Sequence, residues 1–196
     1  MTKTLKLSYF LLLFHTFIFC NASTKIVNED PKLNYTVSFE NPESHYLEVT
    51  LNFDNIHAKK TTLSLPVWTP GYYLILETPR YIVDFEVVDE NDKKISWKKN
   101  TKNSWVIENG AKTKFAVKYR VFANKKSVAE SYVDANKAFL MPNTIFMHIE
   151  NNINNPVTLT LDKNTKWSTI STGLKCIDKN KNIYYAENFD IFYDSP

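Results

Sequence analysis

Apolar and polar residues alternate one by one along several stretches of this chain of 196 residues. The stretches with the clearest alternation are 33–39, 47–53, 83–87 and 115–122. Because successive side chains of a β-strand point to opposite faces, a period of two predicts strands with one buried face. Shorter runs that are also typical of strands lie at 62–67, 95–97, 105–107, 144–149 and 157–161, and only 127–138 could form a short helix. We therefore predict an all-β fold, an antiparallel β-sandwich or saddle-shaped curved sheets with at most one short helix.

Turn residues separate these predicted strands. Pro42, within 40–44, cannot donate a ladder hydrogen bond, so the first two strands are expected to form a hairpin. The polar cluster 89–94 predicts a second hairpin, and Asn109-Gly110 is the strongest turn signal in the chain. No internal repeat and no linker rich in proline, serine or glycine divides residues 23–196, so we expect one domain there.

The N-terminus has the pattern of a secretory signal peptide. Lys3 and Lys6 precede an apolar run over 7–19, and Cys20 and Ala22 supply the small residues that signal peptidase requires. The run is shorter than the about 20 residues that cross a bilayer, so no transmembrane anchor is expected after cleavage. We expect residues 1–22 to be removed and the protein to be exported, to a periplasmic or extracellular location. Lipidation at Cys20 is a competing fate.

Charge and cysteine content argue against a nucleic-acid-binding protein and against a disulfide-stabilised one. The 24 lysines and arginines are balanced by 21 acids, and Arg80 and Arg120 are the only arginines, so no nucleic-acid partner is expected. Cleavage would leave Cys176 alone, which rules out an intramolecular disulfide. The alternation around Cys176 predicts that it is buried. Stability must then come from a core, for which 43% hydrophobic and 14% aromatic residues suffice.

No catalytic or metal-binding motif is present in the sequence. Zinc hydrolysis requires two histidines one helical turn apart with a glutamate between them, whereas His45, His57 and His148 are widely separated. A Gly-x-Ser-x-Gly elbow and a glycine-rich phosphate loop are also missing. We therefore predict no catalytic residue, no metal ligand and no cofactor in this chain.

The most distinctive segment is 66–74, which reads Pro-Val-Trp-Thr-Pro-Gly-Tyr-Tyr-Leu. Two prolines and a glycine stiffen it, and Trp68, Tyr72 and Tyr73 crowd around the turn. A rigid aromatic loop can act as a stacking platform for a peptide or a glycan. Alternatively, Trp68 fills the end of a β-sandwich.

This segment, with Glu77 and Arg80, resembles the Pro-x-Trp-x-Pro-Gly-Ser-Tyr element of glycyl-aminopeptidase-type zinc metallopeptidases. The similarity covers about residues 33–196. It continues through Val83-x-Phe85, Lys98, Trp105-Val106, Val117-Lys118-Tyr119-Arg120-Val121, Ser127-Val128, Asp134, Ala138-Phe139 and Tyr193-Asp194-Ser195-Pro196. Tyr72 stands where a small residue is usual, and Leu76 and Ala129 stand where basic residues are expected.

The resemblance implies a non-catalytic N-terminal accessory domain that packs beside the peptidase active site and helps wall it. The family's zinc-binding catalytic domain and its common PDZ domain do not occur in this sequence, so we expect a fragment, with zinc only in the missing part. Its partner would be the peptidase catalytic domain in cis. The candidate substrate or interdomain contacts are Trp68, Tyr72, Tyr73, Arg80 and Asp134. The alternative is a free-standing secreted β-sandwich module that binds peptide or glycan through the Trp68 loop.

Overall fold

The computed structural model describes residues 31–69, 73–163 and 166–196. The predicted signal peptide, the competing lipid site at Cys20 and the candidate residue Tyr72 lie outside the described residues. The strands are β1 (Lys32–Ser38), β2 (Tyr46–Asp54), β3 (Thr61–Ser64), β4 (Ile82–Val88), β5 (Trp97–Lys99), β6 (Ser104–Ile107), β7 (Phe115–Phe122), β8 (Tyr132–Val133), β9 (Ala138–Phe139), β10 (His148–Ile149), β11 (Val157–Asp162), β12 (Lys175–Asp178) and β13 (Ile183–Ala186). The helical elements are η1 (Pro42–Ser44), η2 (Thr78–Tyr81), α1 (Pro142–Ile145) and α2 (Phe189–Tyr193).

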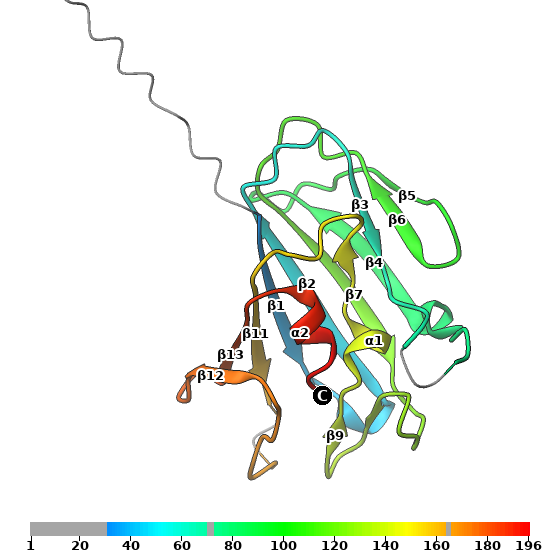
Figure 1. Cartoon of the computed structure of the whole chain (residues 1–196), viewed down its shortest axis with the longest axis vertical. Helices are drawn as coiled ribbons and strands as arrows, with labels where there is room; N and C mark the ends of the chain where they lie inside the picture. The colour runs from blue at the N-terminus through cyan, green and yellow to red at the C-terminus, as the bar shows by residue number, and fades with distance from the viewer. Residues whose placement is uncertain (1–30, 70–72, 164–165) are drawn as a thin grey trace, which may run out of the picture.

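The strands form two main sheets, and neither closes into a barrel (Figure 1). The larger sheet has seven strands in the order β12-β13-β11-β1-β2-β7-β4. The smaller sheet has four strands in the order β10-β3-β6-β5, and β8 and β9 form a separate two-stranded ribbon. In Figure 1 both α-helices lie over one face of the larger sheet. The predicted all-β class is confirmed, with two short α-helices where at most one was expected.

The core lies between the larger sheet and the elements that cover its inner face. Every second residue of β1, β2 and β7 is buried, as the alternation predicted. Tyr35 of β1 stacks on Phe192 of α2, with 5.4 Å between their ring centroids, and lies edge-on to Phe146 at 5.0 Å. These rings bury the apolar face of α2, which is otherwise too short to be stable by itself.

Two predicted turns are present, and only the second of them leads from one sheet to the other. The hairpin of β1 and β2 is confirmed by continuous antiparallel pairing from Lys32↔Asp54 to Ser38↔Glu48. After β4, the turn closes through hydrogen bonds from Asp89 N–H to the Lys93 carbonyl (2.9 Å) and from Ile95 N–H to the Val87 carbonyl (2.8 Å). The chain then leaves for β5 in the smaller sheet, so the hairpin extends no further.

Asn109-Gly110 forms a turn but does not join a hairpin, because β6 pairs with β3 and β5 while β7 pairs with β2 and β4. Gly110 has φ +64°, which favours glycine. The buried Asn109 side chain accepts a hydrogen bond from the Thr61 hydroxyl (3.1 Å) and donates one to the Ala58 carbonyl (2.6 Å). The turn is therefore held by the connection between β2 and β3, and it carries the chain from one sheet to the other.

The segment 127–138 is not helical. Asp134 accepts hydrogen bonds from the backbone N–H groups of Asn136 (2.8 Å) and Lys137 (2.9 Å), and the Ser127 hydroxyl accepts one from Ala129 N–H (3.1 Å). Such side-chain acceptors compete with the hydrogen bonds of a helix. The segment instead contains the ribbon strand β8 and the turn into β9.

The strand expected at 144–149 is also wrong over most of its length. Pro142 begins α1, where its fixed φ suits a first helical position, and only 148–149 are extended as β10. Residues 142–147 are all buried, so their apolar run carried no alternation that could distinguish a strand from a helix.

Two further expectations are corrected within the larger sheet. β1 and β11 pair in parallel, from Leu33↔Val157 to Ser38↔Asp162, because β11 follows a long excursion through the smaller sheet and returns alongside β1. Cys176 is exposed, because β12 is the edge strand and has a neighbour on one side only. Among the described residues no helix has the length and hydropathy needed to span a membrane.

Candidate functional site: the aromatic loop

The candidate site is the aromatic loop, residues 65–76, of which 65–69 and 73–76 are described. It leaves the end of β3, where Leu65 is fully buried and its N–H donates to the Asn103 carbonyl (2.9 Å). A hydrogen bond from Leu76 N–H to the Val67 carbonyl (2.7 Å) closes its base. The ladder of β3 does not continue into the loop because Pro66 has no backbone N–H to donate.

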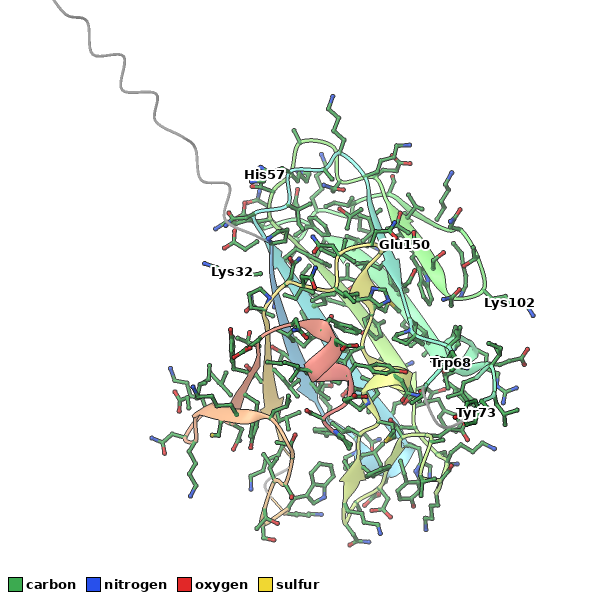
Figure 2. The ribbon with its side chains drawn as sticks, in the orientation of Figure 1. Lys32, His57, Trp68, Tyr73, Lys102 and Glu150 are labelled. Atoms are coloured by element: carbon green, nitrogen blue, oxygen red, sulfur yellow. The ribbon has the colours of Figure 1, made fainter. Side chains whose placement is uncertain are left out.

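Between its two ends the loop exposes large apolar side chains. Trp68 is 47% exposed and Tyr73 is 80% exposed, and Leu74 and Ile75 are also exposed. Figure 2 shows Trp68 and Tyr73 at the same edge of the molecule. With nearly half its surface in solvent, Trp68 does not serve as a buried plug for the end of a sandwich, so the loop presents an apolar surface.

A chain of hydrogen bonds anchors the loop to both α-helices. The Tyr193 hydroxyl of α2 donates to the Trp68 carbonyl (2.7 Å) and lies 2.7 Å from the Thr69 hydroxyl oxygen. Because a phenol has one proton, the Thr69 hydroxyl is then the donor to Tyr193. Thr69 in turn accepts from the Asn143 side-chain amide of α1 (2.9 Å). Partial burial raises the pKa of Tyr193, which keeps its hydroxyl protonated as this network requires.

Tyr73 has a strained backbone. Its φ is +54°, in the left-handed region that bulky residues rarely adopt. Strain of this kind persists only where surrounding structure imposes it, and it is concentrated at functional positions. Here the strained residue is the most exposed of the loop's aromatic side chains that the structure describes.

The structure places Arg80 near the base of the loop. Arg80 lies in η2, where its guanidinium donates to the Tyr81 hydroxyl (2.8 Å) and lies 4.9 Å from the centre of that ring. Its carboxylate partner Glu77 is 3.6 Å away, and both side chains are more than half exposed. This guanidinium remains accessible to a partner surface.

Asp134 belongs to a different part of the molecule, the turn between β8 and β9. Its carboxylate accepts the two backbone N–H groups of the turn and the Tyr132 hydroxyl (2.9 Å). The hydrogen bond from Asn136 N–H is the largest cause that lowers the pKa of Asp134. No hydrogen bond or ion pair joins Asp134 to the described part of the aromatic loop or to Arg80, so Asp134 has a structural role in its own turn.

The sequence pointed to Trp68 and Tyr73 but missed Thr69, Asn143 and Tyr193, which hold them in place. No local pattern marks such a network, because its members are 74 and 124 residues apart. The histidines are not brought together either, and the described residues contain no group of three or more histidine, cysteine, aspartate or glutamate side chains that could hold a metal ion.

The architecture defines the class of the protein, an open β domain built from two main sheets. It resembles an aminopeptidase N family protein from Idiomarina loihiensis, with a TM-score of 0.75 and 22% identity over 83% of this chain and 28% of that chain. An M1 zinc metallopeptidase from Deinococcus radiodurans matches with a TM-score of 0.37 and 11% identity, over 81% of this chain and 37% of that chain. This chain thus spans less than half the length of either structure. No curated protein sequence matches it.

Residues 34–196 match the family model of the Peptidase M61 N-terminal domain. Because the match covers most of the chain, the protein belongs to this domain family. The resemblance drawn from the Trp68 segment is thereby confirmed.

Proposed function

We propose that this chain is a non-catalytic N-terminal accessory domain of an exported zinc metallo-aminopeptidase. It packs beside the catalytic domain, which holds the zinc, and helps wall the active site. Residues 1–22 act as a signal peptide that directs residues 23–196 to the periplasm or the extracellular space. Membership of the Peptidase M61 N-terminal domain family supports this role.

The observation that carries the proposal is the exposed aromatic loop, anchored to both helices. Trp68 and Tyr73 present apolar surface to solvent, while hydrogen bonds from Tyr193 and Thr69 fix the backbone beneath them. Large apolar side chains on a rigid support lose little conformational entropy on binding, which is why aromatic residues dominate the energetics of interfaces. The loop is therefore the contact with the catalytic domain.

Binding in trans tests this proposal. Residues 23–196 are mixed with the catalytic part of a full-length family member that lacks its own N-terminal domain, and the Kd is measured by calorimetry. We expect a saturable complex that Trp68→Ala and Tyr73→Ala each weaken about tenfold, the effect of losing an interface hot spot. Trp68→Ala should leave the fold intact, because Tyr193 bonds the backbone carbonyl of residue 68 and the side chain is half exposed.

Ile177→Ala is the matched control, since Ile177 is 52% exposed and lies on β12, away from the loop in Figure 1. It should leave the Kd unchanged. Equal effects of Ile177→Ala and Trp68→Ala, or no complex at all, would contradict the proposed contact.

The exposure of Trp68 also favours the alternative of a free-standing module that binds peptide or glycan. The two functions differ in the partner: a module binds small ligands at the loop without any catalytic domain. Titration of peptides and oligosaccharides, followed by tryptophan fluorescence in wild type and Trp68→Ala, separates them.

A further inference from the structure

A cavity of about 600 Å³ is lined by residues of β9 and of the segment 166–174. Both lie at the lower end of the molecule in Figure 1. Its volume is within the range of about 300–1,000 Å³ typical of ligand sites. The aromatic loop and the network beneath it contribute none of its described lining residues. We call it the lysine-lined cavity, for Lys137, Lys163 and Lys166 on its wall.

The floor of the lysine-lined cavity is aromatic and apolar, and its walls are tied together. Phe39, Phe146 and Phe192 lie at the floor. Trp167 packs edge-on against Phe39, with 4.9 Å between ring centroids, and its indole N–H donates to the Ala135 carbonyl (3.1 Å). This hydrogen bond joins the wall at 166–174 to the turn between β8 and β9, so the cavity is preformed.

The charged side chains described on the cavity wall are all of one sign. Its described lining residues include three lysines and no aspartate or glutamate. Lys163 donates to the carbonyls of Trp167 (2.6 Å) and Ser168 (3.3 Å), which leaves one of its three N–H bonds for a ligand. The Lys137 ammonium makes no ion pair or hydrogen bond with any described residue, and the nearby Asp134 carboxylate is occupied by its own turn. The cavity therefore complements an anion.

One wall also offers an unpaired backbone. Residues 169–171 line the cavity, and no hydrogen bond with a described residue involves their backbone or side chains. Gly173 lies beside Ser195, since a Cβ added to this glycine would be 3.5 Å from the serine hydroxyl oxygen. This wall therefore contacts the residues that follow α2. Free backbone N–H and carbonyl groups can pair with the backbone of a bound peptide.

We propose that the lysine-lined cavity binds the carboxy-terminal residue of a peptide. The apolar side chain of that residue enters the aromatic floor, its carboxylate lies between Lys137 and Lys163, and its backbone amide pairs with residues 169–171. A fatty acid would use the floor and the lysines but would leave the backbone groups unpaired, which is why a peptide fits better. The inference does not rest on the proposed function.

Calorimetric titration of residues 23–196 with acetyl-Ala-Ala-Phe tests the proposal. The matched ligands are the same peptide with a carboxy-terminal amide, which removes the charge alone, and decanoate, which supplies a lipid carboxylate. We expect saturable binding of the acid, about threefold to fivefold weaker binding of the amide, and weaker binding of decanoate. The fold-change corresponds to a partly exposed ion pair.

Lys137→Gln should weaken binding of the peptide acid by the same factor and leave binding of the peptide amide unchanged. Lys137 lies in an exposed turn, so this variant should fold normally. Lys98→Gln, an exposed lysine on β5, is the control and should change neither. The proposal is overturned if the acid does not bind saturably, if acid and amide bind equally, or if decanoate binds more tightly than the peptide acid.

Discussion

At the scale of single residues, Asp89 shows how one carboxylate can join two turns. Its side chain is buried, accepts backbone N–H groups from Asn91 (3.0 Å) and Lys93 (3.0 Å), and pairs with Lys112 (2.7 Å) beyond the Asn109-Gly110 turn. The hydrogen bond from Lys112 is the largest cause that lowers the pKa of Asp89 to about 2, from the ordinary value of 3.8. The ionised form is therefore the one that the folded state favours.

The first prediction concerns acid pH. A carboxylate with a lowered pKa stabilises the fold above its unfolded pKa, and this contribution is lost as the pH falls from about 3.8 towards about 2. Asp89→Asn retains the size and one acceptor of the side chain but removes the charge. We expect urea midpoints measured from pH 6 to pH 2 to fall less steeply in Asp89→Asn than in wild type.

Asp162→Asn is the control for that experiment, since Asp162 is exposed at the end of β11. Its profile should follow wild type. An Asp89→Asn profile parallel to wild type below pH 4 would show that the contact with Lys112 contributes nothing to stability.

At the scale of elements, two buried tyrosines position the segment that leaves α1. Tyr35 of β1 donates to the Met147 carbonyl, and Tyr119 of β7 donates to the Ile145 carbonyl (2.8 Å). Ile145 is the last residue of the four-residue helix and Met147 lies two residues beyond it, so the helix cannot satisfy either carbonyl internally. Burial raises the pKa of both tyrosines, so they remain protonated donors.

The second prediction is that Tyr119→Phe destabilises the fold by about 1–3 kcal/mol, because the Ile145 carbonyl is left buried without its donor. Urea denaturation monitored by circular dichroism measures the change. Tyr185→Phe removes a hydroxyl that bonds to no described residue from a half-buried ring, and it should cost less than about 0.5 kcal/mol. Equal costs for the two variants would contradict the role of Tyr119.

At the scale of the whole molecule, an aromatic cluster joins the two sheets. Phe85 of β4 stacks on Trp105 of β6, with 5.4 Å between ring centroids, and contacts Trp97 of β5 edge-on at 4.6 Å. It also lies 6.2 Å from the Tyr119 ring, which belongs to the larger sheet. The sheets share no strand, so they are joined by side-chain packing, and these rings are part of that packing.

The third prediction is that Phe85→Ala costs about 3 kcal/mol, near the lower end for a buried phenylalanine because Phe85 is partly exposed. Near-ultraviolet circular dichroism should also change, because Trp97 and Trp105 lose a packing partner. Phe139→Ala, at a ring that is 41% exposed, should cost less than about 1 kcal/mol. A smaller cost for Phe85→Ala than for Phe139→Ala would mean that the sheets are joined elsewhere.

Much of the fold was predictable because neighbouring residues along a strand alternate between polar side chains in solvent and apolar side chains in the core. The alternation in β1, β2 and β7 identified the strands and their buried faces, and Pro42 and Asn109-Gly110 identified turns. At the candidate site, the prolines and aromatic residues of the segment 66–74 marked it in the sequence, and Trp68 and Tyr73 of this segment are exposed in the structure. The prediction for 127–138 was wrong because side-chain acceptors there compete with helical hydrogen bonds. The prediction for 144–149 was wrong over most of its length because residues 142–147 are all buried and show no alternation.

The sequence by itself determined the all-β class, the first hairpin, the aromatic segment and the lack of a zinc-binding helical motif, since each depends on residues close together in the chain. Only the tertiary structure decided that β6 and β7 enter different sheets, that β11 lies parallel to β1, and that Tyr193 and Asn143 anchor Thr69. The physical reason is that these pairings form between segments tens to more than a hundred residues apart. Which segments pair depends on how the whole core packs, and no local sequence pattern records this packing.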